Sequence, residues 1–123
     1  MKPFALTVGL FAIALVAPSG EAAAQNFGAI AFSTGTGAIG WSFDYGSKSS
    51  AESAALANCR QHGADCIIAT WFRNACGAIA VGDGNGWGAA WSNYRNGAES
   101  EALQICRRNT SNCTVRRWAC TTR

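Results

Sequence analysis

The sequence predicts an α+β protein made of two tandem ββαβ repeats. We expect these repeats to form one mainly antiparallel sheet with two helices on one face, stabilised by disulfides. Three observations lead to this prediction: a duplicated sequence, short runs of alternating apolar residues, and an even number of cysteines. The duplication is the most informative of the three, because overlooking a repeat leads to a wrong assignment of the whole fold.

The chain contains one pattern twice. The segment "GAIAFSTGTGAIGWSFDY" from Gly28 resembles "GAIAVGDGNGWGAAWSNY" from Gly77, and "AESAALANCR" from Ala51 resembles "AESEALQICR" from Ala98. Two cysteines and a tryptophan recur at a constant spacing of 47 residues: Cys59 and Cys106, Cys66 and Cys113, Trp71 and Trp118. The repeats therefore span about residues 27–76 and 77–120.

A single unit of this size buries too little apolar surface to be stable alone. We therefore expect the two copies to share one core in a single domain, residues 25–123.

Residues 1–24 have the composition of a bacterial secretory signal peptide, because Lys2 precedes an apolar run and small residues precede residue 25. The run is shorter than the roughly 20 residues of a membrane span. An uncleaved anchor is the alternative. We expect a secreted or periplasmic protein with no membrane span after signal cleavage.

Each repeat is predicted to contain two strands, a helix and a third strand. Short apolar runs joined by glycine-rich segments, such as "GAIAF" and "WSFDY", are typical of a β-hairpin. In "WSFDY" the aromatic residues alternate with Ser42 and Asp44, and we expect the aromatic face to pack on an alanine-rich helix. The third strands are expected at residues 66–72 and 113–120.

The helices are predicted from alanines spaced four residues apart, which place one small-residue stripe on each helix. An S-x-x-E pattern at a helix start is typical of a capping box, in which two side chains satisfy free backbone N–H groups. We expect such boxes at two pairs: Ser49 with Glu52, and Asn96 with Glu99.

The segment "GTGAIG" matches the dinucleotide-binding pattern G-x-G-x-x-G at Gly35, Gly37 and Gly40. That pattern must follow a strand and open a helix. Here it is followed by the alternating run of residues 41–45, so we predict a hairpin turn and no nucleotide cofactor. The matching "DGNG" at residues 83–86 is also predicted to be a turn, because a calcium loop needs a fuller ligand set.

The six cysteines are expected to form three disulfides, as in other short exported chains. Their gaps are longer than the C-x₂₋₄-C spacing typical of zinc sites, so we expect no metal. Each copy has one cysteine at the helix end and another at the start of the next strand. The predicted pairs are Cys59–Cys66, Cys106–Cys113 and, by elimination, Cys76–Cys120. A Cys59–Cys106 bridge between the repeats is the alternative.

The candidate binding surface lies in the second repeat, where the excess positive charge is found. We expect Trp87 to be exposed, and aromatic residues are enriched at interfaces. Four arginines of this repeat either serve solubility and helix-end electrostatics or bind an anionic partner. The surface consists of Trp87, Arg107, Arg108, Arg116 and Arg117. The expected partner is an unknown protein or an anionic cell-envelope component rather than a nucleic acid, and the oligomeric state is not predicted.

Candidates for catalysis are few. His62, the only histidine, stands at a predicted helix end, where the simpler role is favourable electrostatics with the terminal carbonyls. Asp44 is one of several acids that a glycoside hydrolase could pair, but such an enzyme needs two carboxylates flanking the bond. We name no catalytic residue and favour a non-enzymatic binding protein, such as an inhibitor, an immunity protein or a host-interaction factor. A small cell-wall hydrolase is the alternative.

The duplicated "GAIA", the alanine-rich helix ending in Cys-Arg, and "ACGAIA" between the repeats together resemble a family of small exported bacterial proteins, domain of unknown function 4189. The resemblance covers about residues 27–120. It implies secretion, disulfides and one compact domain. It implies no activity, so it assigns no catalytic residue.

Overall fold

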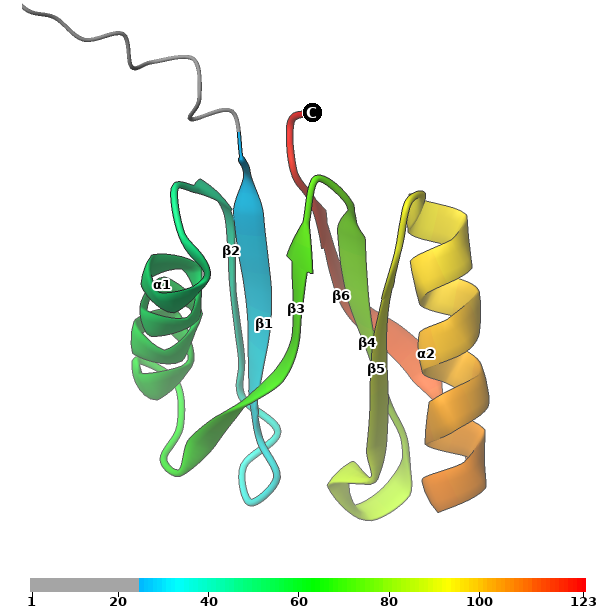
Figure 1. Ribbon diagram of the computed structural model, residues 1–123. Coiled ribbons are helices and arrows are strands. Elements are labelled where there is room, and N and C mark those ends of the chain that lie inside the picture. The colour runs from blue at the N-terminus through cyan, green and yellow to red at the C-terminus, as the bar shows by residue number, and fades with distance from the viewer. Residues whose placement is uncertain (1–24) are drawn as a thin grey trace, which may run out of the picture.

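The computed structural model describes residues 25–123, which form two consecutive ββαβ units (Figure 1). The elements of the first unit are β1 Phe27–Ser33, β2 Ile39–Tyr45, α1 Lys48–Arg60 and β3 Cys66–Arg73. Those of the second are β4 Cys76–Val81, the 3₁₀ helix η2 Asp83–Asn85, β5 Trp87–Ser92, α2 Arg95–Asn109 and β6 Thr114–Cys120. The predicted tandem ββαβ repeats are confirmed. The signal peptide predicted for residues 1–24 lies outside the described residues.

The strands form two three-stranded antiparallel sheets, not the single sheet expected from the sequence. Their strand orders are β2-β1-β3 and β5-β4-β6, so β1 and β4 are the central strands. The sheets lie face to face, and each is covered on its outer face by its own helix (Figure 1). The helices are therefore on opposite sides of the molecule. The physical reason is that both central strands are apolar on both faces, and a single sheet would leave one face in water.

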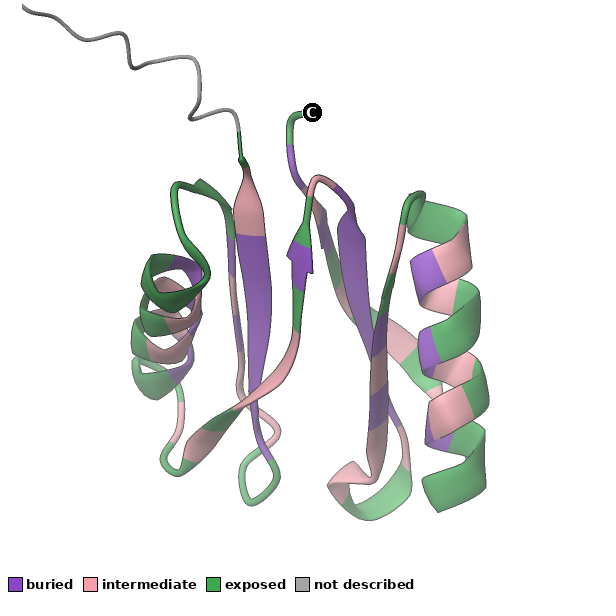
Figure 2. Cartoon of the chain, in the orientation of Figure 1, coloured by how far each residue is buried: buried purple, intermediate pink, exposed green. Residues whose placement is uncertain are grey.

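The central strands direct small and large side chains to opposite faces. Alanines pack against the helices: Ala29, Ala31, Ala78 and Ala80. Larger side chains fill the space between the sheets: Ile30, Phe32, Ile79 and Val81. All eight are fully buried, and Figure 2 shows buried residues along most of β1 and β4. The repeated "GAIA" is thus the sequence of a strand buried on both sides.

Each helix approaches its sheet closely because small residues make the contact. The helix α1 buries Ala51, Ala55 and Cys59 against its sheet. A Cβ atom added at Gly40 of β2 would lie only 2.2 Å from the carbonyl oxygen of Ala55. Gly88 of β5 has the matching position, 2.2 Å from a backbone nitrogen of α2. Larger residues at these strand positions would push the helices away.

The expectation that the aromatic face of "WSFDY" packs on the helix is therefore wrong. Ser42 faces α1, where its Oγ donates a hydrogen bond of 2.6 Å to the carbonyl of Ala51. Trp41 points the other way and packs against the core between the sheets. Stacked sheets pack about 10 Å apart, which leaves room for bulky side chains, whereas each helix contact is lined by small residues and a glycine.

Phe72 of β3 is the large side chain at the centre of this inter-sheet core and is 1% exposed. Its ring lies over Gly28 of its own sheet and Gly77 of the opposite sheet: an added Cβ would meet the ring at 2.3 Å and 2.5 Å, respectively. The matching residue of the second repeat is Ala119. One phenylalanine thus fills a space formed by glycines from both repeats.

Both helices begin earlier than the predicted capping boxes. The N-cap of α1 is Ser47, whose Oγ accepts a hydrogen bond of 3.2 Å from the backbone N–H of Ser50. Tyr94 precedes α2 and makes no side-chain cap. The two glutamates of the expected boxes instead form ion pairs with the first residue of their helix: Lys48–Glu52 at 3.9 Å and Arg95–Glu99 at 3.0 Å.

Both glycine-rich segments form turns, as predicted. Gly37, with φ of 82°, lies in the turn that joins β1 to β2, and these two strands pair antiparallel. Gly40 belongs to β2 itself. In the second repeat, Asp83–Asn85 forms η2, in which Gly84 has a φ of 64°. The "GTGAIG" segment is therefore a hairpin and not a strand-to-helix phosphate loop.

Three disulfides join Cys59 to Cys66, Cys106 to Cys113, and Cys76 to Cys120. These are the three pairs expected from the repeat. The first two tie each helix end to the following chain, seven residues away. The third links β4 to β6 within the second sheet, across a separation of 44 residues.

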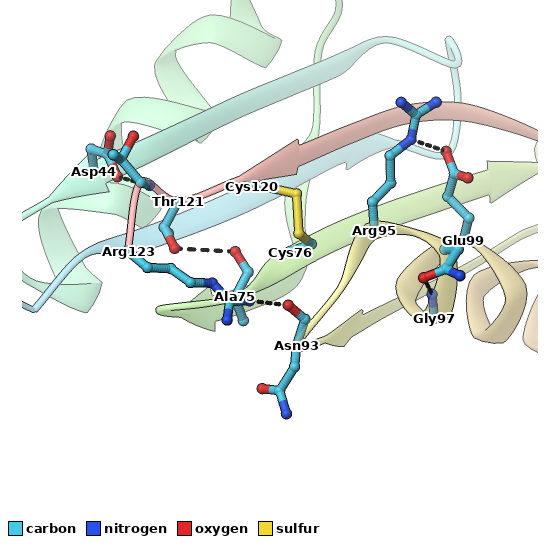
Figure 3. Close-up of a disulfide and its surroundings, with 12 residues drawn as sticks. Asp44, Ala75, Cys76, Asn93, Arg95, Gly97, Glu99, Cys120, Thr121 and Arg123 are labelled. Atoms are coloured by element: carbon cyan, nitrogen blue, oxygen red, sulfur yellow. Dashed lines mark hydrogen bonds and ion pairs between the residues drawn. A yellow bond between two sulfur atoms is a disulfide. The ribbon is translucent and has the colours of Figure 1, made fainter.

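The C-terminal tail connects elements of both repeats (Figure 3). The backbone N–H of Thr121 donates to the carbonyl of Ala75 at 2.9 Å, and that of Thr122 donates to Asp44 Oδ1 at 2.7 Å. The guanidinium of Arg123 donates to the carbonyl of Asn93. The tail therefore holds β2, the β3–β4 turn and the β5–α2 turn together.

Candidate binding cleft between the two repeats

A cleft of about 290 Å³ lies where β3 of the first repeat approaches β5 of the second. It is lined by three consecutive residues of β3, Trp71, Phe72 and Arg73, and by Trp91 of β5. Both β3 and β5 are edge strands of their sheets. In Figure 1 they lie on the same side of the molecule. The cleft is therefore built jointly by the two repeats at one open side of the sandwich.

The two tryptophans of the cleft are accessible. Trp91 is 54% exposed and Trp71 is 40% exposed, whereas Phe72 between them is buried. Trp71 is held in place by its neighbours: its ring centroid lies 6.2 Å from that of Phe27, and the Nζ of Lys48 lies 4.7 Å from the ring. The Trp71 ring therefore lies on the α1 face of β3, whereas Phe72 and Trp91 face the space between the sheets.

Arg73 is the charged residue of the lining, and its side chain lies on the same face of β3 as that of Trp71. Its guanidinium carbon lies 5.9 Å from the centroid of the Phe27 ring, and the residue is exposed. Within residues 25–123 the ion pairs are those at the two helix starts, and neither includes Arg73. The guanidinium is thus free to meet an anionic group, which it can bind through two parallel hydrogen bonds.

The second repeat does not reproduce this lining. At the spacing of 47 residues, Trp71 corresponds to Trp118, but Phe72 corresponds to Ala119 and Arg73 to Cys120. Ala119 is buried in the shared core and Cys120 is bonded to Cys76. The duplicated fold therefore carries the Trp-Phe-Arg combination once.

Trp87 is not the exposed tryptophan, contrary to the expectation. It lies at the start of β5, packs against the inter-sheet core, and has its ring centroid 5.8 Å from that of Phe32. Trp91 is more exposed because it lies at the other end of β5, opposite Gly77, where the cleft opens. Position along one strand, and not residue type, separates the two tryptophans.

The four predicted arginines do not act as one exposed cluster. Arg107 and Arg108 are exposed in the last turn of α2, and Arg116 is exposed on β6. Arg117 is partly buried, with its guanidinium carbon 3.8 Å from the centroid of the Trp41 ring in the opposite sheet. Its role is therefore at least partly structural, as a cation stacked on an aromatic ring.

The two residues considered for catalysis lie apart from the cleft lining. Asp44 accepts the backbone hydrogen bond from Thr122 and has a φ of 63°, so it occupies a structural position at a strand irregularity. His62 is exposed and follows the end of α1, where its backbone N–H donates to the carbonyl of Cys59 at 3.0 Å. Within the part of the chain that the structure describes, no group of three potential metal-ligating side chains comes together.

Sequence reasoning missed the cleft itself. In the sequence, Trp71 marks the repeat through its match with Trp118, and no motif includes Arg73. The available signal was the place where the repeats stop matching, because Phe72 and Arg73 give way to Ala119 and Cys120. The positions at which the two repeats differ therefore indicate residues with a role in only one of them.

The fold and its cleft define a small, disulfide-linked α+β protein with a duplicated unit. Residues 27–120 match the family described as "Domain of unknown function (DUF4189)", and the chain belongs to that family. Protein Rv1269c of Mycobacterium tuberculosis (strain ATCC 25618 / H37Rv) and Protein Mb1300c of Mycobacterium bovis are each 44% identical to it over 61 residues. Those residues are 50% of this chain and 46% of each relative, so the match spans about half of each protein.

The fold also resembles a solved structure. The NMR structure of Rv1813c from Mycobacterium tuberculosis has a TM-score of 0.58 and 22% identity, and the match covers 96% of this chain and 97% of that one. This likeness concerns the fold.

Within residues 25–123, no helix is both long enough and apolar enough to cross a membrane. The three disulfides are compatible with an extracellular or periplasmic location.

Proposed function

We propose that this chain is an exported protein, secreted or periplasmic, that acts by binding a partner through the cleft between its repeats. The observation that carries the proposal is the lining of that cleft by Trp71, Arg73 and Trp91. Tryptophan and arginine are the residue types that most often dominate binding energy at protein interfaces. An inhibitor, an immunity protein and a host-interaction factor all fit this class. The disulfides support export, because such bonds persist in oxidising compartments.

Binding is tested by comparing the mature protein with Trp91→Ala. Each is immobilised and exposed to the native envelope and culture-filtrate fractions. A retained protein is then identified, purified and titrated calorimetrically. We expect Trp91→Ala to weaken the measured affinity at least tenfold, because exposed aromatic anchors lose most of their contact area on truncation. Equal affinity would remove the cleft from the binding site.

The matched control is Phe43→Ala. Phe43 on β2 occupies the position equivalent to that of Trp91 on β5. Each directly follows the residue that pairs with the second alanine-face position of the central strand: Ser42 pairs with Ala29, and Ala90 pairs with Ala78. Phe43 is 46% exposed and is not among the residues that line the cleft. Its removal therefore deletes a comparable exposed aromatic ring, and we expect unchanged affinity.

Export and the hydrolase alternative need separate measurements. Mass spectrometry of the protein from culture filtrate and periplasm should find a mature chain that begins at Gln25. Incubation with purified peptidoglycan and glycans, followed by mass spectrometry of the products, tests hydrolysis. Turnover that disappears in Asp44→Asn or His62→Ala would contradict the proposal and favour a small cell-wall hydrolase.

A further inference from the structure

The outer face of the first sheet has a group of aromatic rings at the end where α1 begins. Phe27 of β1 pairs with Tyr45 of β2 on one side and with Arg73 of β3 on the other, so these three side chains form a row on the α1 face. The ring of Trp71 stacks on that of Phe27, with the centroids 6.2 Å apart. Lys48, the first residue of α1, lies over Trp71. We call these five residues the outer platform.

The helix α1 leaves the outer platform open to solvent. It packs on Ala29 and Ala31, which follow Phe27 along β1. Figure 2 shows the start of β1 as less buried than the stretch that follows it. Tyr45 and Trp71 are each 40% exposed. Exposed apolar rings bordered by polar side chains are typical of an interaction site, so the outer platform is a candidate binding surface.

Two cations border the rings of the outer platform. The Nζ of Lys48 lies 4.7 Å from the centroid of the Trp71 ring, and the guanidinium carbon of Arg73 lies 5.9 Å from that of the Phe27 ring. Neither ion pair of residues 25–123 includes Arg73. The pair of Lys48 with Glu52 is 3.9 Å long and partly exposed, and such pairs contribute little. The charge of this surface therefore favours an anionic ligand.

The backbone under the outer platform is already paired. Phe27 belongs to the central strand β1, whose N–H and C=O groups bond to β2 and β3. An extended peptide lying over Phe27 therefore finds no free strand edge, and a ligand there must contact side chains. The face of an aromatic ring is electron-rich and attracts C–H groups such as those on the apolar face of a sugar ring. On an open surface the sugar hydroxyls keep their bonds to water.

We infer that the outer platform binds an acidic polysaccharide, with sugar rings stacked on the aromatic side chains and sugar carboxylates on Arg73 and Lys48. The row crosses three neighbouring strands, a width of about 10 Å, so it contacts more than one sugar ring of a polymer. This inference goes beyond the proposed function, because it concerns the outer face of the first sheet and not the space between the sheets.

The second repeat has only part of this arrangement. There Arg95 lies over Trp118. The strand pair that corresponds to the Phe27–Arg73 pair is the Cys76–Cys120 disulfide. A disulfide thus takes the place of the central ring and its neighbouring arginine, and we expect one polysaccharide site per chain.

The first test uses the wild-type mature protein and two uronic acid tetrasaccharides, tetragalacturonate and tetramannuronate. Each is prepared as the free acid and as the methyl ester, which keeps the sugar rings and removes the charge. Isothermal titration calorimetry should show one-to-one binding of at least one acid and affinity for its ester that is at least tenfold lower, as expected for the loss of charge-assisted hydrogen bonds. Equal affinity for acid and ester, or binding of neither acid, would overturn the inference.

A charge control separates the polysaccharide from an acidic peptide. Tetraglutamate, acetylated at its N-terminus and amidated at its C-terminus, has as many carboxylates as the tetrasaccharides but no sugar ring to stack on the aromatic side chains. We expect its affinity to be at least tenfold lower than that of the acid tetrasaccharide that binds more tightly. Equal affinity would show that the surface recognises charge alone, which favours an acidic protein partner and overturns the inference.

The second test assigns the contacts with paired variants. Arg73→Gln should abolish the preference for the acid over the ester, whereas Arg116→Gln, at another exposed arginine, should retain it. Trp71→Ala should weaken binding of the acid about fivefold, whereas Trp118→Ala, its counterpart at 38% exposure in the second repeat, should not. The unfolding midpoint of each variant shows that a change in affinity is not a loss of fold. Equal losses in Trp71→Ala and Trp118→Ala would contradict the assignment to the first repeat.

The third test separates this inference from the proposed function and uses Trp91→Ala. Trp91 lies on the other sheet, opposite Gly77, and faces the space between the sheets. The variant should therefore keep its affinity for the acid tetrasaccharide. Weaker tetrasaccharide binding in Trp91→Ala would place the sugar in the cleft and overturn the inference. If the tetrasaccharide tests fail while a partner identified from the envelope still needs Trp91, the inference is rejected and the proposed function stands.

Discussion

The guanidinium carbon of Arg95 lies 3.8 Å from the centroid of the Trp118 ring. The same side chain pairs with Glu99, so the first residue of α2 is tied to its own helix and to β6. The first repeat has the same arrangement, in which Lys48 lies over Trp71 and pairs with Glu52. This repeated contact fixes the start of each helix against the third strand of its unit.

Arg95→Ala should therefore destabilise the protein. We expect the free energy of unfolding to fall by about 1 kcal/mol, the sum of an exposed cation–π contact and a surface ion pair. Urea denaturation followed by far-UV circular dichroism measures this loss. Lys48→Ala is the matched control, because the equivalent contacts of Lys48 are longer: 4.7 Å to the Trp71 ring and 3.9 Å to the Glu52 carboxylate. Its loss of stability should therefore be smaller. A larger loss for Lys48→Ala would contradict the ranking.

Phe72 and Gly77 should be energetically coupled. Phe72→Ala removes a fully buried ring and should cost about 3–5 kcal/mol. Gly77→Ala should also destabilise, because the new Cβ would lie 2.5 Å from that ring. With the ring removed, the new methyl group has room, and Gly77→Ala should cost at least about 1 kcal/mol less than in the wild type. Additive losses in a double-mutant cycle would show that the ring does not lie over Gly77.

Gly88→Ala tests the close packing of helix on sheet. The added methyl group would meet the backbone of α2 at 2.2 Å, so strand and helix must separate, and we expect a loss of about 1–3 kcal/mol in stability. Gly35→Ala is the matched control, because an added Cβ there has no atom within 4 Å. Its unfolding midpoint should stay close to that of the wild type. Similar effects at both positions would argue against the close contact.

The Cys76–Cys120 disulfide should contribute more stability than either short bridge. It closes a separation of 44 residues, against seven for the Cys59–Cys66 bridge. Chain entropy predicts losses of about 4 and about 2.5 kcal/mol when each pair is replaced by serine. Thermal unfolding of the two double variants compares them directly. A lower midpoint for the variant without Cys59–Cys66 would contradict the entropic ranking.

The candidate site was only partly predictable. Aromatic and arginine residues were expected to form a binding surface, but the structure partly buries Trp87 and stacks Arg117 on Trp41. Trp71 and Trp91 line one cleft because β3 and β5 belong to different sheets whose open edges coincide. That coincidence depends on how the two sheets are stacked. No pattern within either strand specifies it.

The local units could be predicted from the sequence: the two ββαβ repeats, the hairpin turns and the two short-range cysteine pairs. These follow from spacing along the chain, since a turn, a periodic helix and a bridge of seven residues are short-range features. That the six strands form two sheets with helices outside became clear only from the three-dimensional arrangement. The alternation of Ala29 with Ile30 is the same in either arrangement. What selects between them is which partner covers each face, and that depends on contacts between residues far apart, such as Phe72 over Gly28 and Gly77.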